Sequence, residues 1–188
     1  MEKTQNHAKI LEMAYIAMFA VIITVCAWIT IPLPGVPFTL QTFSIFCAAL
    51  VLGGKKSLIS VIVYILLGAV GLPVFSSFNS GVGALLGVTG GYIIGFIFIP
   101  ITYWLATSLF GKNTLVSVIS LIVGLAICYA FGTVWFVYMY SRANGAIGVF
   151  TALSKCVFPF IIPDLVKLAV ALAVSKAVAK YAKIPQAH

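Results

Sequence analysis

The sequence LVSVISLIVGLAICYAFGTVWFVYMY, residues 115–140, contains no charged side chain. An α-helix needs about 20 apolar residues to cross the roughly 30 Å hydrocarbon core of a bilayer. This stretch is long enough and apolar enough to do so, and it therefore predicts a membrane-spanning helix. Similar apolar runs lie on both sides of it along the chain.

The composition of the whole chain agrees with a membrane environment. Of the 188 residues, 63% are apolar and 7% are charged, and the mean hydropathy is +1.20. Soluble domains are roughly 45–50% apolar and about 25% charged. The charged side chains are too few to cover the surface of a folded chain in water. The composition therefore excludes a cytosolic enzyme, a secreted disulfide scaffold and a disordered tail.

Six apolar runs predict six membrane-spanning helices in a single all-α domain, residues 1–188. The runs cover residues 10–31, 38–52, 58–71, 85–110, 115–140 and 149–182. The first run is longer than the apolar core of a signal peptide, so we expect it to be retained. Pro159 and Pro163 predict a break in the last run, with the helix resuming near Pro163.

The basic residues predict the orientation of these helices. If the N-terminus is cytoplasmic, most of the 11 basic residues fall in cytoplasmic segments, namely Lys3, Lys9, Lys55, Lys56, Lys112, Lys176, Lys180 and Lys183. The other three, Arg142, Lys155 and Lys167, lie in or near external segments. Because Lys and Arg concentrate on the cytoplasmic side, both termini are expected inside. This scattered distribution does not favour a nucleic-acid partner, which would need one basic face.

Small residues recur at regular spacings in two of the runs. Every fourth position holds a glycine at Gly83, Gly87, Gly91 and Gly95, which predicts close helix packing within the chain, with dimerisation as the less favoured alternative. A stripe of alanines three apart lies in the first run, at Ala14, Ala17 and Ala20. It suits either internal packing or docking of another membrane protein.

The chain holds few groups that could carry out catalysis. The three acids are Glu2, Glu12 and Asp164, and both histidines, His7 and His188, lie near the ends. The four cysteines occur singly in apolar runs and are expected to be buried apolar residues. We therefore predict no enzyme, no metal site and no cofactor. Gly54 and Lys55 look like part of a phosphate-binding loop, but the other residues of that motif are missing from the sequence around them. Any energy from ATP must therefore come through another protein.

One pair of ionisable residues indicates a ligand site. Asp164 and Lys167 are three apart and share a helix face, and ionisable groups within a span usually face a cavity. Further polar or small residues are expected at the same external depth, namely Thr39, Gln41, Asn79, Thr89, Gly91 and Tyr92. Together they suit a small, mostly apolar ligand with an amide-like head. The alternative is a self-neutralising pair surrounded by residues with local structural roles.

Several segments resemble the BioY family, the biotin-binding S components of energy-coupling factor (ECF) vitamin transporters. They are VPFTLQT (36–42), LLGAVGLPVF (66–75), GVTGGYIIGF (87–96), YAFG (129–132), and Pro159 and Phe160 with DLVK (164–167). They span most of the chain in the order of the family. Val88 stands where the family usually has proline, and Ile162 with Pro163 stands where it tends to have Pro-Gly.

This resemblance implies an S component in the plasma membrane of a prokaryote. It would bind biotin from outside and dock on a transmembrane coupling protein driven by two ATPases. The resemblance implies that Asp164 and Asn79 pair with the ureido ring of biotin, and that Lys167 either meets the ligand carboxylate or holds Asp164 charged. The docking residues would be Ala14, Ala17 and Ala20, and the loop 74–83 would act as a lid.

Other functions remain open from the sequence alone. An S component for another small vitamin would keep the fold and change only the pocket. An intramembrane enzyme would need a nucleophile and a base at depth. A small channel or structural membrane protein would need a continuous polar stripe through the bilayer, whereas the polar residues cluster at one end of the expected helices.

Overall fold

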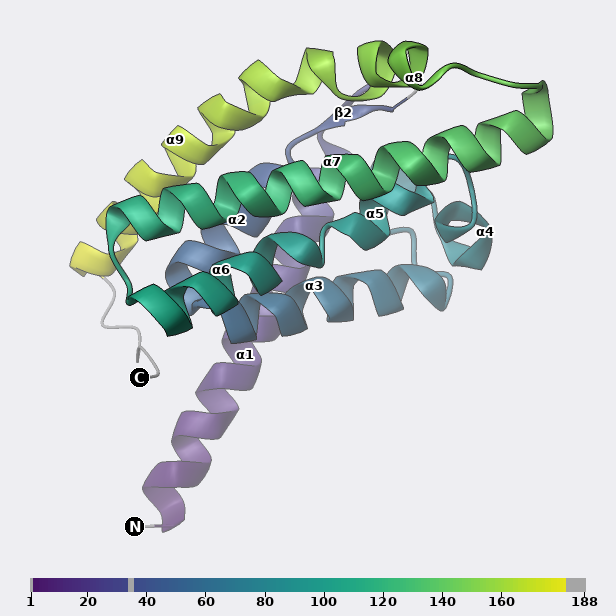
Figure 1. Cartoon of the computed structure of the whole chain (residues 1–188). Coiled ribbons are helices and arrows are strands. Elements are labelled where there is room, and N and C mark those ends of the chain that lie inside the picture. Colours follow the sequence, from purple (N-terminus) through teal and green to yellow (C-terminus); the bar gives the residue numbers. More distant parts are fainter. Residues whose placement is uncertain (1, 34–35, 182–188) are drawn as a thin grey trace.

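The computed structural model describes residues 2–33 and 36–181 of the chain, and they form a bundle of helices (Figure 1). Its helices are α1 (Glu2–Trp28), α2 (Gln41–Leu52), α3 (Gly54–Ala69), α4 (Gly81–Leu85), α5 (Gly90–Gly95), α6 (Phe98–Phe110), α7 (Thr114–Asn144), α8 (Val149–Cys156) and α9 (Phe158–Tyr181). A short 3-10 turn, η1 (Ser76–Phe78), follows α3. Two short strands, β1 (Thr30–Ile31) and β2 (Phe38–Thr39), join α1 to α2.

Helix α2 lies at the centre of the bundle. It packs against α1, α3, α6 and α9, while α7 packs against α5 and α6. Ile45, Phe46, Ala48 and Ala49 are completely buried, as expected for a helix that is apolar on all sides. The antiparallel strands pair Thr30 with Thr39 and so fix the chain that enters α2.

The structure confirms a mostly helical protein with stretches long and apolar enough to cross a membrane. Four such stretches lie within the described residues, at Lys9–Trp28, Gly90–Phe110, Thr114–Asn144 and Val149–Lys180. Large apolar side chains such as Leu66, Leu109 and Val134 are exposed on the outside of the bundle, where lipid would cover them. The β1–β2 pair is an addition to the predicted all-α fold.

One apolar run is broken where no break was predicted, and the break in the last run lies at another residue than predicted. The run 85–110 is divided, because the chain between α4 and α5 turns so tightly that a Cβ on Gly90 would lie 1.7 Å from the carbonyl oxygen of Leu85. In the last run the break falls at Val157, and Pro163 lies inside α9. Pro159 is in the first turn of α9, where a helix N–H has no intrahelical partner to lose.

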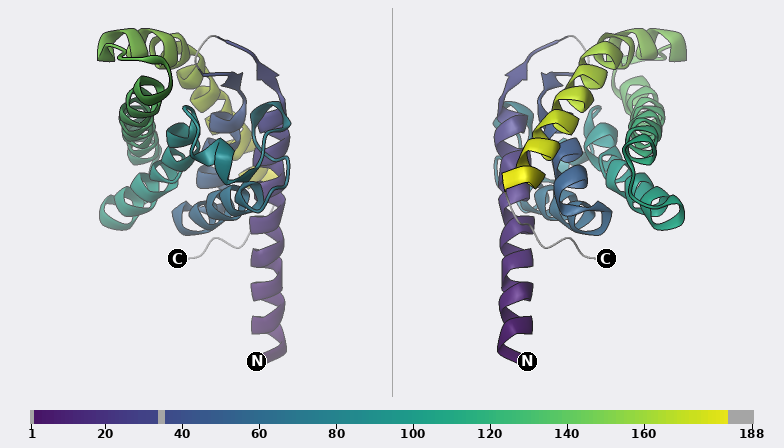
Figure 2. Two further views of the ribbon diagram at one scale, coloured as in Figure 1. Left: turned by 90° about the vertical axis from the view of Figure 1, so that its right-hand side faces the viewer. Right: turned by 90° about the vertical axis from the view of Figure 1, so that its left-hand side faces the viewer.

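The ends of the helices form two groups. The start of α1, the α2–α3 and α6–α7 turns and the end of α9 lie toward one end of the molecule, with β1, β2 and α8 toward the other (Figure 1). The first turns of α1 project beyond the bundle (Figure 2). Lys56 binds Glu12 at 2.8 Å and so joins the start of α3 to α1. Lys183, one of the lysines used to predict the orientation, lies outside the described residues.

Candidate functional site

A charged pair is buried where α9 packs against α2. The side chains of Asp164 and Lys167 are on the first turns of α9, and these residues are only 2% and 7% exposed. The Lys167 ammonium donates to Asp164 Oδ1 at 2.7 Å, to Thr42 Oγ1 at 3.2 Å and to the carbonyl oxygen of Thr39 at 2.6 Å. Since an ammonium has three N–H donors, each donor of Lys167 has an acceptor within the protein.

The Asp164 carboxylate is held by three donors from three helices. Its Oδ1 accepts from Lys167 and from the Thr42 hydroxyl, which lies 2.8 Å away on α2. Its Oδ2 accepts from the Tyr129 hydroxyl on α7. Hydrogen bonds to an ionised carboxylate are about twice as strong as neutral ones, so the site joins α2, α7 and α9.

Aromatic rings cover one side of the charged pair. The Lys167 ammonium lies 4.0 Å from the centre of the Phe38 ring, within the range of a cation–π interaction. Phe38 in turn stacks on Phe160 with their ring centres 6.2 Å apart. These rings help to bury the pair, and low local polarity strengthens its electrostatic interactions.

A small cavity of about 50 Å³ adjoins the charged pair. Its walls combine one carboxylate, one ammonium, hydroxyls, thiols and aromatic rings. They come from Val36, Pro37, Thr39, Thr42, Tyr92, Phe96, Leu125, Cys128, Tyr129, Cys156, Phe160, Asp164 and Lys167. Pockets for drug-sized ligands measure about 300–1,000 Å³, so this cavity is smaller than a pocket for a ligand of that class.

The structure brings together some of the predicted site residues. Thr39 and Tyr92 line the cavity with Asp164 and Lys167, and the Tyr92 hydroxyl lies 3.0 Å from that of Thr133. Gly132 leaves room for the Tyr92 ring, because a Cβ there would lie 2.2 Å from the ring. The predicted residues that line the cavity are therefore brought together from β2, α5 and α9.

Other predicted site residues lie outside the cavity walls. Gln41 is buried, but its amide donates to the Tyr64 hydroxyl at 2.6 Å. Gly91 packs against Trp135, and Thr89 precedes α5. Asn79 is exposed in the loop after η1.

Two residues of the polar cluster were not predicted as site residues. Thr42 and Tyr129 both bind the Asp164 carboxylate, yet they are far from it in the sequence. Both fall in segments that resemble the BioY family, VPFTLQT and YAFG, and that was the available signal. Only the packing of α2 and α7 near α9 shows where their hydroxyls point.

In each of the two small-residue patterns, some residues are packed within the bundle and others are not. Gly91 and Gly95 pack against α7, with a Cβ on Gly95 falling 3.0 Å from Cys128 Sγ, as predicted for packing within the chain. Gly83 has no neighbour within 4 Å of such a Cβ, so the four glycines do not form one continuous face as the spacing suggested. In α1, Ala14 and Ala17 are exposed, whereas Ala20 is 1% exposed.

The cysteines are buried and form no disulfide, as predicted. Cys128 and Cys156 belong to the cavity wall, and Cys26 and Cys47 lie in the bundle. Within residues 2–33 and 36–181, no three His, Cys, Asp or Glu side chains are arranged to bind a metal ion. The polar contacts around Asp164 and Lys167 are hydrogen bonds and one ion pair.

This fold and this cluster define a helical membrane protein with a buried polar cluster beside a small cavity. The sequence profile of the BioY family matches residues 1–184, and the chain belongs to that family. A probable biotin transporter BioY of Pyrococcus horikoshii is 37% identical over 165 residues, which cover 88% of this chain and 94% of the relative. The biotin transporter BioY of Thermotoga maritima is 42% identical over 155 residues, 82% of this chain and 87% of the relative.

The fold also matches a solved structure. The S-component for biotin from an ECF-type ABC transporter superimposes with a TM-score of 0.81 at 26% sequence identity. The match covers 95% of this chain and 96% of the other. The arrangement of helices described above is thus that of an S component.

Proposed function

We propose that this chain is the biotin-binding S component of an ECF transporter, which captures biotin on the external side and delivers it through an ATP-driven complex. The observation that carries the proposal is the buried Asp164 carboxylate beside a cavity with aromatic walls. The names of the relatives and of the matched structure give the ligand. The chain supplies capture, and its partners supply ATP hydrolysis.

The chemistry of the cavity suits the head of biotin. The ureido ring has two N–H donors and one carbonyl acceptor, and Asp164 offers a carboxylate that already accepts hydrogen bonds from Thr42 and Tyr129. A ureido N–H would join or replace one of these hydroxyl donors. Asn79 would supply an amide partner when the loop 74–83 closes as a lid, and the aromatic walls would cover the apolar rings.

Lys167 holds Asp164 charged in this proposal. Its three donors already have acceptors within the protein, and one of them is Asp164 itself. Binding the ligand carboxylate would require Lys167 to release one of these acceptors. Of the two roles that the family resemblance allows, the geometry therefore favours the support of Asp164.

We also propose that the chain crosses the plasma membrane of a prokaryote six times as one domain, with both termini inside. The ion pair between Lys56 and Glu12 supports this orientation, because it joins Lys56 of a predicted cytoplasmic segment to the start of the first apolar run, just after the N-terminal tail. The completely buried positions of α2 explain how a helix of 12 residues can serve as an internal span, because its neighbours shield it from lipid.

The partners in this proposal are a transmembrane coupling protein and two ATPases. Ala14 and Ala17 are exposed on α1 and would allow a second helix to approach closely, whereas the buried Ala20 would pack within the chain. Substituting Ala17 by Leu should weaken assembly with the coupling protein without changing biotin binding. Co-purification of the two membrane proteins measures the first, and calorimetry the second.

Titration calorimetry of the purified chain with biotin tests the function. We expect tight one-to-one binding that falls at least about a hundredfold in Asp164→Asn, since hydrogen bonds to charged groups contribute about 1.5–3 kcal/mol each. Glu12→Gln is the matched control, because it removes another acid far from the cavity. Wild-type protein that binds no biotin, or equal binding by Asp164→Asn, would contradict the proposal.

A further inference from the structure

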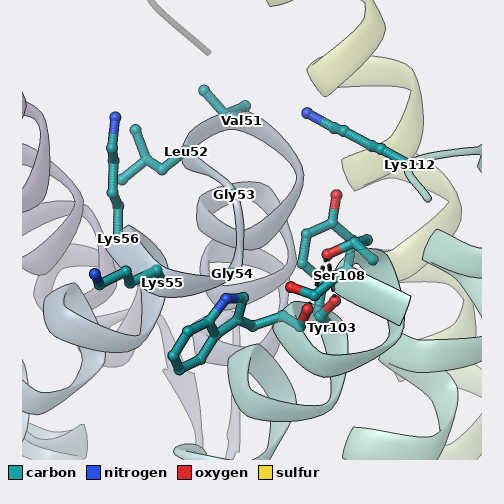
Figure 3. A pocket seen from close by; sticks show the side chains of 11 residues that line it. Val51, Leu52, Gly53, Gly54, Lys55, Lys56, Tyr103, Ser108 and Lys112 are labelled. Carbon is teal, nitrogen blue, oxygen red and sulfur yellow. Dashed lines mark hydrogen bonds between the residues drawn. The ribbon is translucent and has the colours of Figure 1, made fainter. Parts of the chain in front are cut away.

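A larger cavity lies at the other end of the bundle, between the α2–α3 turn and α6 (Figure 3). It measures about 520 Å³, and lysines such as Lys55 and Lys56 line it, while among its described wall residues there is no acid. The N–H groups of a neutral urea need acceptors, and hydrogen bonds to an ionised acceptor are about twice as strong as neutral ones. The smaller cavity beside Asp164 offers such an acceptor, so the ureido head fits there rather than in the larger cavity.

The two oxygen atoms of the Asp164 carboxylate differ in how many donors they already have. Oδ1 accepts from the Lys167 ammonium at 2.7 Å and from the Thr42 hydroxyl at 2.8 Å, whereas Oδ2 accepts from the Tyr129 hydroxyl. An ionised carboxylate has about two acceptor positions on each oxygen. Among the described residues Oδ1 thus has two donors and Oδ2 has one, so a ligand N–H can join the carboxylate at Oδ2.

The Tyr129 hydroxyl is held beside this oxygen by the packing of its ring. Tyr129 lies on α7 near Leu125 and Cys128, and the spacing of these three residues places them on one face of the helix, where all of them line the cavity. The ring also packs against the apolar core. The packing fixes the ring, but the hydroxyl hydrogen can still rotate about the C–O bond toward another acceptor.

A cyclic urea presents a donor and an acceptor side by side. Its five-membered ring holds each N–H on the same side as the carbonyl oxygen, so each edge of the ureido head carries one N–H next to the C=O. The Tyr129 hydroxyl and Asp164 Oδ2 lie within hydrogen-bond distance of each other. They can offer one donor and one acceptor at close spacing, and the pair is therefore complementary to one edge of the head.

We propose that Tyr129 is a ligand-binding residue that determines specificity for the ureido carbonyl. A ureido N–H binds Asp164 Oδ2, and the Tyr129 hydroxyl turns its hydrogen from Oδ2 to the carbonyl oxygen of the ligand. Lys167 and Thr42 keep their hydrogen bonds to Oδ1. The other ureido N–H is left for Asn79. This inference rests on the proposed function, and it adds a direct contact between Tyr129 and the ligand.

A purely positioning role for Tyr129 makes a different prediction. If the hydroxyl only holds Asp164 in place, Tyr129→Phe should weaken the binding of every ureido ligand by the same factor, because all of them lose the same support at the carboxylate. If the hydroxyl donates to the carbonyl, the loss should depend on how well the ligand accepts a hydrogen bond at that position.

Calorimetry with biotin and 2-thiobiotin separates these roles. In 2-thiobiotin a sulfur atom, which is a weak acceptor, replaces the ureido oxygen, and both N–H donors remain. The wild type should prefer biotin, and Tyr129→Phe should reduce this preference roughly two- to tenfold, the range for the loss of one neutral hydrogen bond. Tyr138→Phe is the matched control, because it removes a phenol hydroxyl from an exposed residue of the same helix and should keep the preference.

Infrared spectroscopy observes the proposed hydrogen bond directly. Biotin labelled with ¹³C at the ureido carbonyl is added at saturating concentration to the wild type, to Tyr129→Phe and to Tyr138→Phe. A hydrogen bond to the carbonyl oxygen lowers its stretching frequency. The labelled carbonyl should therefore absorb at higher frequency in Tyr129→Phe than in the wild type, and at the wild-type frequency in Tyr138→Phe.

The outcomes distinguish this inference from the proposed function. Equal affinity of the wild type for biotin and 2-thiobiotin would overturn the contact with the carbonyl, and this measurement needs no variant to fold. The same carbonyl frequency in the wild type and in Tyr129→Phe would also overturn it, while the proposed function would stand because biotin still binds. Wild-type protein that binds no biotin would overturn the proposed function and this inference with it.

Discussion

Replacing Lys167 by Met removes the ammonium from the buried pair while keeping most of the volume of the side chain. The change leaves the Asp164 carboxylate, 2% exposed, with only the Thr42 and Tyr129 hydroxyls as donors. Breaking a buried ion pair from one side costs about 3–5 kcal/mol, and we expect the lower end because two donors remain. For a chain of this length about 3 kcal/mol corresponds to a fall in melting temperature of roughly 6–12 °C.

The double variant Asp164→Asn with Lys167→Met serves as the matched control. It removes both charges, so no unpaired charge stays buried, and it should be more stable than Lys167→Met alone. A double-mutant cycle from thermal unfolding in detergent should give a coupling of about 2–3 kcal/mol between the two side chains. A coupling near zero would refute the view that Lys167 supports the charge of Asp164.

The role of Lys167 toward the ligand is separated by comparing biotin with its uncharged methyl ester. If Lys167 only supports Asp164, Lys167→Met should weaken the binding of both compounds by the same factor, because the damage is at the ureido end. If Lys167 binds the ligand carboxylate, the wild type should prefer biotin and the variant should lose that preference. Loss of the preference in calorimetry would refute the role that we assign.

Two substitutions test the surroundings of the cavity. Gly132→Ala should place a Cβ 2.2 Å from the Tyr92 ring and push that ring into the cavity. In calorimetry this should lower the affinity for biotin at least about tenfold. The control Gly83→Ala meets no atom within 4 Å and should leave the affinity unchanged in the same titration. Trp28→Phe should remove the 2.8 Å hydrogen bond to the carbonyl oxygen of Pro73 and loosen the loop 74–83. The release of radiolabelled biotin should then be several-fold faster. An unchanged release rate would argue against a lid.

The fold was predictable from the sequence to the level of apolar runs and their ends. Long uncharged runs can be recognised by length and composition alone, and α7 covers the whole of its predicted run, 115–140. The division of the run 85–110 was not predicted, because the residues at its breaks are mostly apolar residues and glycine, as in the rest of the run. Only the close contact between Gly90 and Leu85 shows that the chain turns there.

The candidate site was predictable where its residues are near each other in the sequence. Asp164 and Lys167 are three apart on a helix, and their side chains form the ion pair that this spacing predicts. Thr42 and Tyr129 could not be assigned in this way, because nothing local places their hydroxyls at Asp164. The roles of all these residues in ligand binding stay predictions until binding is measured.

The hydrogen bonds of the site also explain why its cavity is so small. Asp164 takes its donors from Thr42, Tyr129 and Lys167, and these bonds draw α2, α7 and α9 together. A ureido ring must replace or join these donors. Biotin binding therefore exchanges hydrogen bonds within the protein for hydrogen bonds to the ligand, and a change in their number contributes little to the binding free energy. The net affinity must then come mainly from burying the apolar rings of the ligand against Tyr92 and its aromatic neighbours. An analogue that keeps the ureido ring but lacks apolar bulk should therefore bind far more weakly than one that keeps the bulk and one ureido N–H.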